Sequence, residues 1–365
     1  MKKNFIHSQQ ENPVIHGEDE GSLLSINHNR ARLLVRQAHH PSNHPKQSRG
    51  ISRGSRRLII SIDLGGTNLK AALLDLKFRI LDRKILSTQR FGRKEGLIKA
   101  IIECVRLIVK KHNLKPAAIL GLGLGLPGPI DYRRGIVHFF PNIPGWKEVN
   151  LKSILVKKTR LPVFLDNDAN LMSLAEHRLG AAKGFSNAIC LTLGTGVGGG
   201  VILENRLHRG PDNAAGEIGH IPINENGPNC NCGGVACLEA YIGNTRILKE
   251  AQRLFKRKIS LEELSLLAKK GDRKAKSIWM NVARRLGIAL SAVVNLLNPD
   301  IIVLGGGVAN AGEVLFDGVK KAINSRSMSV QAKRVKVVKA GLGSDAGLIG
   351  AAILVKEGSV DEDIY

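Results

Sequence analysis

Three glycine-rich segments, each directly after a run of apolar residues, constrain this chain more than any other feature. They are Asp63-Leu64-Gly65-Gly66-Thr67-Asn68, Gly194-Thr195-Gly196-Val197-Gly198-Gly199-Gly200 and Gly305-Gly306-Gly307. Glycine lets a strand end in a turn whose backbone N–H groups come close to a ligand, as in phosphate-binding loops. A single turn of this kind is more often a tight β-hairpin. Three together predict a protein that holds a polyphosphate.

The three turns have distinct expected roles. In the first, Gly65 and Gly66 would bring N–H groups to a phosphate, Thr67 would add a hydroxyl donor, and Asp63 could hold Mg²⁺ through water. The second turn, a loop over 194–200, would clasp the same polyphosphate from the opposite side. The third, at 305–307, can pack against a flat nucleoside.

The apolar pattern around the turns alternates between strand-like and helix-like periods. From Leu58 onward, two strand-like runs joined by the first glycine turn predict a β-hairpin. Further strands are expected at 118–131, 161–166, 188–193, 201–203 and 300–307. Helices are expected at 94–112, 170–179, about 246–297 and about 345–356. This alternation over 365 residues predicts an α/β protein of two lobes.

Residues 1–57 differ from the rest and are interpreted as a flexible basic extension, in which only 23–38 has the spacing of a short helix. The chain has 55 Lys and Arg against 31 Asp and Glu, a formal net charge of +24. Such a charge suits a polyanionic partner or attracts anionic nucleotides. Because the basic residues are scattered, a solvated basic surface is the plainer interpretation, and nucleic-acid contact stays open.

No apolar run reaches the roughly 18 residues that span a bilayer, and no signal-peptide core is found near the start. We therefore expect a cytoplasmic protein without membrane contact. Cys104 and Cys190 lie in apolar segments and are expected to be buried. Aromatic residues make up only 4% of the chain, which disfavours a ligand site of stacked rings.

One histidine and three cysteines form the most specific segment: His220, Cys230, Cys232 and Cys237. In a reducing compartment, clustered cysteines indicate metal ligation rather than disulfides. This set is typical of a closed tetrahedral zinc site, in which the metal is structural. Such a zinc would hold the flanking Glu217 and Glu239 in place, where their carboxylates could accept hydrogen bonds from sugar hydroxyls.

A second acidic segment, Asp166-Asn167-Asp168-Ala169-Asn170, lies between an expected strand and an expected helix. A carboxylate at such a junction is often a helix N-cap, and Asp166 could be that or a solvated neighbour. Asp168 is the better candidate for a general base. Phosphoryl transfer needs one positioned acceptor for the hydroxyl proton, with orientation and charge stabilisation supplying the rest.

Eight motifs occur in the order found in the ROK family: DLGGTN, LPGPID, PNIPGW, DNDAN, GTGVGGG, GEIGH, CNCGGVACLE and NPDIIVLGGG. The chain resembles this family over about residues 58–355. ROK proteins are sugar kinases and sugar-sensing repressors. The resemblance implies an α/β, two-lobed actin-like ATPase (ribonuclease H-like) fold with a cleft between the lobes. It also implies ATP, Mg²⁺ and a structural Zn²⁺ as cofactors.

The resemblance also implies a domain plan and an assembly. Residues 58–175 would form the smaller lobe, completed by the C-terminal helix at about 345–356. Residues 176–344 would form the larger lobe with the zinc loop. Family members suggest a homo-oligomer, either a dimer or a tetramer.

Functional residues follow from the same resemblance. Asp168 would be the catalytic base, and the hexose would contact Asn142, Asn167, Asp168, Glu217, His220 and Glu239. The zinc ligands would be His220, Cys230, Cys232 and Cys237. The ATP phosphates would lie against Asp63, Gly65, Gly66, Thr67, Asn68, Gly194, Thr195, Gly196 and Gly198, and the adenosine against Gly305, Gly306 and Gly307. One departure is Ala236, where family members commonly have glycine; a methyl group is tolerated there if φ is negative.

The expected reaction is transfer of a phosphoryl group from MgATP to the 6-hydroxyl of an aldohexose. PNIPGW together with the zinc segment favours glucose, while N-acetylmannosamine, N-acetylglucosamine and fructose stay open as acceptors. A sugar-responsive DNA-binding repressor is the alternative from another class. Residues 27–38 loosely resemble the first helix of a winged helix-turn-helix, but 39–57 lack the apolar stripe of a recognition helix. Repressors also tend to lose the ATP turns, which are complete here.

Overall fold

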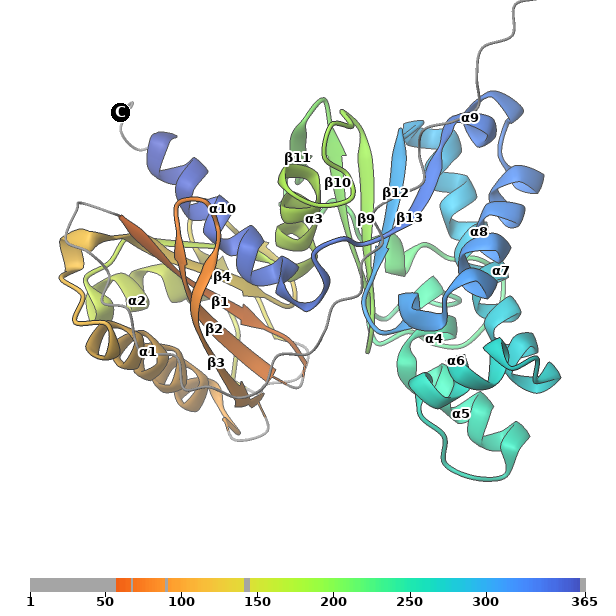
Figure 1. The fold of residues 1–365 in the computed structure, drawn as a ribbon, viewed down its shortest axis with the longest axis horizontal. Helices are drawn as coiled ribbons and strands as arrows, with labels where there is room; N and C mark the ends of the chain where they lie inside the picture. Colours follow the sequence, from red (N-terminus) through yellow and green to blue (C-terminus); the bar gives the residue numbers. More distant parts are fainter. Residues whose placement is uncertain (1–56, 67, 89–90, 141–144, 362–365) are drawn as a thin grey trace, which may run out of the picture. The chain divides into compact units, whose positions relative to one another are not determined.

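A computed structural model describes residues 57–361 apart from 67, 89–90 and 141–144 (Figure 1). The predictions for residues 1–56, for Thr67 and for Asn142 lie outside this part of the chain. Within it, strands and helices alternate as the sequence predicts, which confirms the α/β class.

The first five-stranded sheet has the order β3-β2-β1-β4-β8. Its strands are β1 (Leu58–Leu64), β2 (Asn68–Asp75), β3 (Ile80–Ser87), β4 (Ile119–Leu126) and β8 (Val163–Asn167). The predicted hairpin is present, because β1 and β2 pair in antiparallel fashion, while β4 pairs in parallel with β1 and β8. β3 was not predicted, because three consecutive charged residues, Asp82, Arg83 and Lys84, interrupt its apolar pattern; the strand is partly exposed at the sheet edge.

Helices cover both faces of the first sheet (Figure 1). They are α1 (Lys94–Lys111), α2 (Leu151–Thr159) and α10 (Ala346–Asp361). Alternate residues of β1 point to opposite sides: Ile60 and Ile62 pack in one core with α1, whereas Ile59 packs with Leu348 and Ala352 of α10. This period of two is that of a strand buried on both faces.

The second five-stranded sheet repeats the plan, with the order β11-β10-β9-β12-β13. Its strands are β9 (Ala188–Leu193), β10 (Val197–Leu203), β11 (Arg206–His208), β12 (Ile301–Gly305) and β13 (Lys336–Lys339). Again three strands are antiparallel and the following ones parallel. Two sheets of the same topology therefore form the framework.

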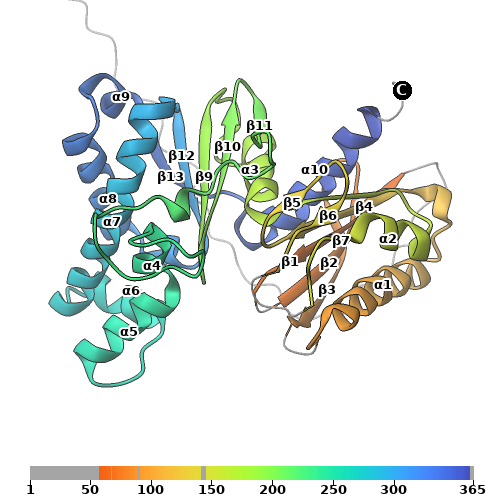
Figure 2. The ribbon, with the colours of Figure 1, turned by 180° about the vertical axis from the view of Figure 1, so that it is seen from behind.

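Helices also cover both faces of the second sheet. One core joins it to a group of helices: α4 (Leu238–Ile242), α5 (Asn244–Phe255), α6 (Leu261–Lys269), α7 (Arg273–Leu297) and α8 (Glu313–Arg326). The other core contains α3 (Asp168–Arg178). The short α9 (Ser329–Arg334) follows α8. A small sheet of β5 (Ile130–Asp131), β6 (Ile136–Val137) and β7 (Val149–Asn150) completes the structure (Figure 2).

Helix α7 is the one described helix long and apolar enough to cross a membrane by length and composition. Half of that apolar stretch is buried inside the protein, and its Trp279, Leu286 and Leu290 belong to the core of the second sheet. This burial is the arrangement of a core helix.

The predicted glycine loop over 194–200 is too long. Only 194–196 form the turn, and Gly198, Gly199 and Gly200 lie within β10. A Cβ at Gly198 would lie 2.9 Å from the Cβ of Ala169, and one at Gly200 would collide with the Oγ of Ser173. These glycines therefore let α3 approach the sheet closely, a packing role that the sequence pattern did not reveal.

Glu176 fixes the other end of α3. Its buried carboxylate accepts hydrogen bonds from the backbone N–H groups of Ala181 (2.8 Å), Gly341 (2.9 Å) and Leu342 (2.8 Å). Because 341–342 belong to the connection from β13 to α10, this side chain ties α3 to the segment that returns the chain to the first sheet.

We expect Gly200→Ala to lower the free energy of unfolding by about 1–3 kcal/mol, because overpacking forces α3 away from β10. Urea denaturation measures the change. Gly194→Ala is the matched control, since a Cβ there meets no heavy atom within 4 Å. Equal stability of the two variants would contradict the packing role.

Candidate active site and metal centre

Asp168 is the first residue of α3 and directly follows β8. The helix begins here because the side-chain oxygen of Asn167 accepts hydrogen bonds from the N–H groups of Ala169 (2.9 Å) and Asn170 (3.3 Å). Asn167 is therefore the N-cap, and the expectation that Asp166 is an N-cap or a solvated neighbour is wrong. The amide of Asn167 also donates to the carbonyl of Gly128 (3.1 Å).

Asp166 is 2% exposed and fully paired. Its Oδ2 accepts from Arg209 Nε (2.8 Å) and Nη2 (2.7 Å), and its Oδ1 accepts from the Asn170 amide (3.1 Å). A carboxylate buried to this extent requires such a partner. Asp166 therefore holds the β8–α3 junction together instead of facing solvent.

Asp168 has no such cation: no ion pair reaches it from the described residues. Burial and the nearby charges of Asp63 and Glu217 raise its pKa to about 7, against a hydrogen bond from the N–H of Ala169 that lowers it. A carboxyl group with a pKa near neutrality is suited to take up a proton. The sequence-predicted Asp63, Asp168 and Glu217 thus lie close enough to interact.

Asp63 lies at the end of β1, beside Lys70 of β2. The Nζ of Lys70 is 3.4 Å from Asp63 Oδ2 and donates to the carbonyl of Ser344 at 2.8 Å. Burial raises the pKa of Asp63, and Lys70 opposes this rise. Sequence reasoning missed Lys70, although the hairpin register pairs it directly with Asp63, so the predicted hairpin contained the signal.

The three glycine turns lie near one another. A Cβ on Gly66 would lie 3.9 Å from the Oγ1 of Thr195, so the first turn faces the second. In the third, Gly306 has φ of 84°, and a Cβ there would collide with the backbone of Leu193 just before the second turn. Such a conformation favours glycine. Among the described residues, the predicted cofactor-binding turns therefore converge on one region.

Glu239 holds the second glycine turn, at 194–196, in place. Its Oε2 accepts a hydrogen bond from the N–H of Val197 (2.8 Å), and the N–H of Asn244 donates to the carbonyl of Gly194 (3.0 Å). α4 and α5 thereby fix the turn between β9 and β10. One carboxylate oxygen of Glu239 is used in this way.

The predicted zinc ligands form one cluster. The ligand atoms of His220, Cys230, Cys232 and Cys237 all lie within 4.8 Å of one another. The Sγ atoms of Cys232 and Cys237 are 3.7 Å apart, and Cys230 Sγ is 3.6 Å from His220 Nδ1. A tetrahedral zinc with Zn–S bonds of about 2.3 Å needs ligand atoms at such spacings. The donor set therefore fits zinc, and the two remaining cysteines, Cys104 and Cys190, are free and buried as expected.

His220 connects this cluster to Glu217. Its Nδ1 faces Cys230, whereas its Nε2 is 3.8 Å from Glu217 Oε2. A histidine that binds metal through one nitrogen commonly presents the other to a carboxylate, which fixes the ring. The metal loop thus helps to orient Glu217, a residue predicted to bind the sugar.

The Ala236 backbone is left-handed, with φ of 58°, so the negative φ under which a methyl group would be tolerated is not met. Its N–H donates to the carbonyl of Pro228 (3.0 Å), and its own carbonyl accepts from Ile223 (3.0 Å). These bonds hold a conformation that costs a residue with Cβ about 1–2 kcal/mol. The glycine common in the family at this position would avoid that cost.

The two sheets of the same topology, with glycine turns near Asp63 and Asp168, have the arrangement of the two-lobed actin-like ATPase fold. A family model described as the ROK family matches residues 59–358, and the chain belongs to this family.

Relatives of both functional classes are similar over most of the chain. The glucokinase of Thermotoga maritima is 36% identical and covers 82% of this chain and 97% of its own. The xylose repressor of Caldicellulosiruptor bescii is 32% identical and covers 84% of this chain and 82% of its own. A ROK family glucokinase from Streptomyces griseus, solved in complex with glucose and AMPPNP, has a TM-score of 0.73 at 33% identity and covers 82% of this chain and 100% of its own.

We expect Asp168→Asn to raise the melting temperature of the ligand-free protein at about pH 8 and to lose this advantage toward pH 4. The native carboxyl has a pKa of about 7 against a reference of 3.8, so the native state binds the proton more tightly and ionisation destabilises it as pH rises. Calorimetry across this pH range measures the effect.

Asp82→Asn is the control with the opposite sign. Burial alone would raise the pKa of Asp82, but hydrogen bonds from Lys111 and His112 lower it overall. Its charge therefore stabilises the fold at neutral pH, and its loss should reduce the melting temperature there. A destabilised Asp168→Asn protein at about pH 8 would contradict the assignment.

In the zinc-loaded protein, we expect the Ala236→Gly variant to have a free energy of unfolding about 1–2 kcal/mol higher than the Ala289→Gly variant. Only the first substitution removes a Cβ from a left-handed backbone position. Both side chains are buried, and Ala289 lies within α7. Chemical denaturation compares the two variants. Equal losses of stability would show that the φ of Ala236 carries no strain.

Proposed function

We propose that this ROK protein is an ATP-dependent sugar kinase that phosphorylates glucose at its 6-hydroxyl. The observation that carries the proposal is Asp168, a carboxylate with a pKa of about 7 and no cation beside it among the described residues, next to the converging glycine turns. The glucokinase names of the relatives support the choice of glucose.

In this proposal, Asp168 takes the proton of the sugar hydroxyl as the oxygen attacks the γ-phosphorus. A carboxyl group whose pKa is near neutral pH is ionised in a useful fraction of molecules, and it is still basic enough to hold the proton that it takes up. Backbone N–H groups of the turns at 65–66 and 194–196 would stabilise the phosphate charge. Mg²⁺, held through water by Asp63, would neutralise part of the triphosphate charge when bound.

The sugar would be held by carboxylates that other parts of the fold fix in place. Glu217 is oriented by His220 of the zinc loop, and Glu239 by the N–H of Val197. Asn142, Asn167 and His220 complete the proposed contacts. Zinc would act through this loop as a structural ion, with Cys230, Cys232 and Cys237 as its other ligands.

We propose further that the enzyme works in the cytoplasm as a homo-oligomer and that 58–175 with α10 form one lobe and 176–344 the other. The exposed apolar side chains Leu296, Met328 and Val330 offer surface for self-association. Light scattering at several concentrations tests the assembly.

Asp168→Asn should lower kcat for glucose by about 10²-fold to 10⁴-fold or more while leaving glucose binding largely intact, because the amide cannot accept the proton. A coupled ADP-release assay across glucose, fructose, N-acetylglucosamine and N-acetylmannosamine measures turnover. Asp82→Asn, on the exposed edge strand β3, should retain full turnover. Full activity of Asp168→Asn would refute the base, and a preference for another sugar would refute glucose.

The repressor alternative has its own support in the xylose repressors among the relatives. It predicts a salt-dependent shift of DNA by the full chain and no phosphorylation of any sugar in the panel. The kinase proposal predicts turnover without such a shift.

A further inference from the structure

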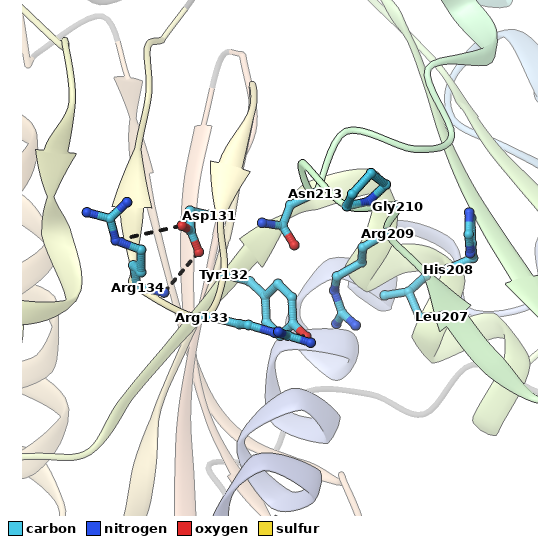
Figure 3. A pocket seen from close by; sticks show the side chains of 10 residues that line it. Asp131, Tyr132, Arg133, Arg134, Leu207, His208, Arg209, Gly210 and Asn213 are labelled. Carbon is cyan, nitrogen blue, oxygen red and sulfur yellow. Dashed lines mark hydrogen bonds and ion pairs between the residues drawn. The ribbon is translucent and has the colours of Figure 1, made fainter.

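A cavity of about 430 Å³ is lined by none of the proposed catalytic residues (Figure 3). One wall is the β5–β6 connection at 131–134, and the other is the end of β11 with the loop after it at 207–213. None of the residues assigned above to glucose, ATP or zinc lines it. Its volume is within the range of small-molecule pockets.

The cavity carries excess positive charge. Its lining includes the three arginines Arg133, Arg134 and Arg209, whereas Asp131 is the one carboxylate in the lining. Asp131 is paired with Arg134: its Oδ1 accepts a hydrogen bond from the Arg134 backbone N–H (2.9 Å), and its Oδ2 is 4.0 Å from the Arg134 Nε. Arg133 bonds to the hydroxyl of Tyr132 (3.1 Å), and among the described residues no carboxylate is within ion-pair distance of it. Its charge is therefore available to an anion.

Arg209 is a preorganised donor in the same cavity. Nε and Nη2 bind Asp166, and the guanidinium lies 4.1 Å from the centre of the Tyr132 ring. Its side chain is only 16% exposed, so little rotamer freedom is left to lose on binding. Nη1 makes no hydrogen bond with the described residues and keeps its protons for a ligand.

We propose that this cavity binds a small phosphate-bearing anion between Arg133 and Arg209. A phosphate group matches the fork of an arginine and takes a charge-assisted hydrogen bond from each. Asn213 and Asp131 offer polar groups for hydroxyls beside it. Free inorganic phosphate and the sugar phosphate produced by the proposed reaction share this chemistry, and the second of these rests on the proposed function.

Binding there is linked to the catalytic junction through one side chain. Arg209 holds Asp166, whose Oδ1 accepts from the N–H of Asn167 (2.7 Å), the residue before Asp168. An anion that accepts hydrogen bonds from the same guanidinium weakens the ion pair between Arg209 and Asp166. Arg209 is thus a positioning residue between the cavity and the proposed base.

Isothermal titration of the full-length protein with inorganic phosphate, and separately with glucose 6-phosphate in saturating glucose, tests the proposal. Both anions should bind the wild type, and Arg133→Gln should weaken each at least about 10-fold, the effect of losing one charge-assisted bond. Arg206→Gln removes a charge from β11, next to the lining residue Leu207 but outside the cavity lining, and should bind as the wild type does. Thermal unfolding checks that both variants are folded.

Binding of both anions with Arg133 dependence supports a phosphate site, and binding of glucose 6-phosphate alone supports a sugar phosphate site. Absence of binding, or equal affinity in Arg133→Gln and the wild type, overturns the proposal. The titration measures binding and does not depend on kinase turnover. Arg133-dependent phosphate binding by a protein that phosphorylates no sugar would thus refute the proposed function and leave the cavity site standing.

Discussion

The junction between β8 and α3 holds two carboxylates of opposite electrostatic character, two residues apart. Asp166 is buried and neutralised by Arg209, whereas no cation from the described residues pairs with Asp168, and its pKa rises to about 7. The paired carboxylate fixes the backbone, and the unpaired one is left able to exchange a proton. Environments that separate two neighbouring carboxylates in this way are typical of sites where one has a structural and the other a chemical role.

Close packing of α3 makes this junction possible. Glycines in β10 remove the side chains that would otherwise separate the helix from the sheet, and Glu176 fixes the far end of the helix to the connection into α10. The helix that carries Asp168 is thereby held by both the second sheet and the segment leading back to the first. A zinc ion bound by the cluster would likewise restrain Glu217, because it would fix the ring of His220.

Local patterns predicted most of this arrangement. The hairpin at the first glycine turn, the strand and helix around Asp168 and the zinc ligands follow from short-range spacing and were found. Long-range contacts were not: Arg209 is 43 residues from Asp166, and no local signal connects them. The glycines of β10 were assigned to a loop because a sequence does not reveal which glycines a distant helix requires. The glycine common in the family at position 236 indicates a strained backbone there, but only the φ angle of Ala236 establishes it.

The raised pKa of Asp168 means that this carboxyl group holds its proton up to neutral pH in the ligand-free protein. Carbon NMR of protein labelled at the aspartate carboxyl carbons, titrated with pH and compared with Asp168→Asn, tests it directly. One signal should titrate with a midpoint near pH 7 and be missing from the variant. If every aspartate signal instead titrates near the ordinary value of about 4, Asp168 is already ionised well below neutral pH and its pKa is not raised.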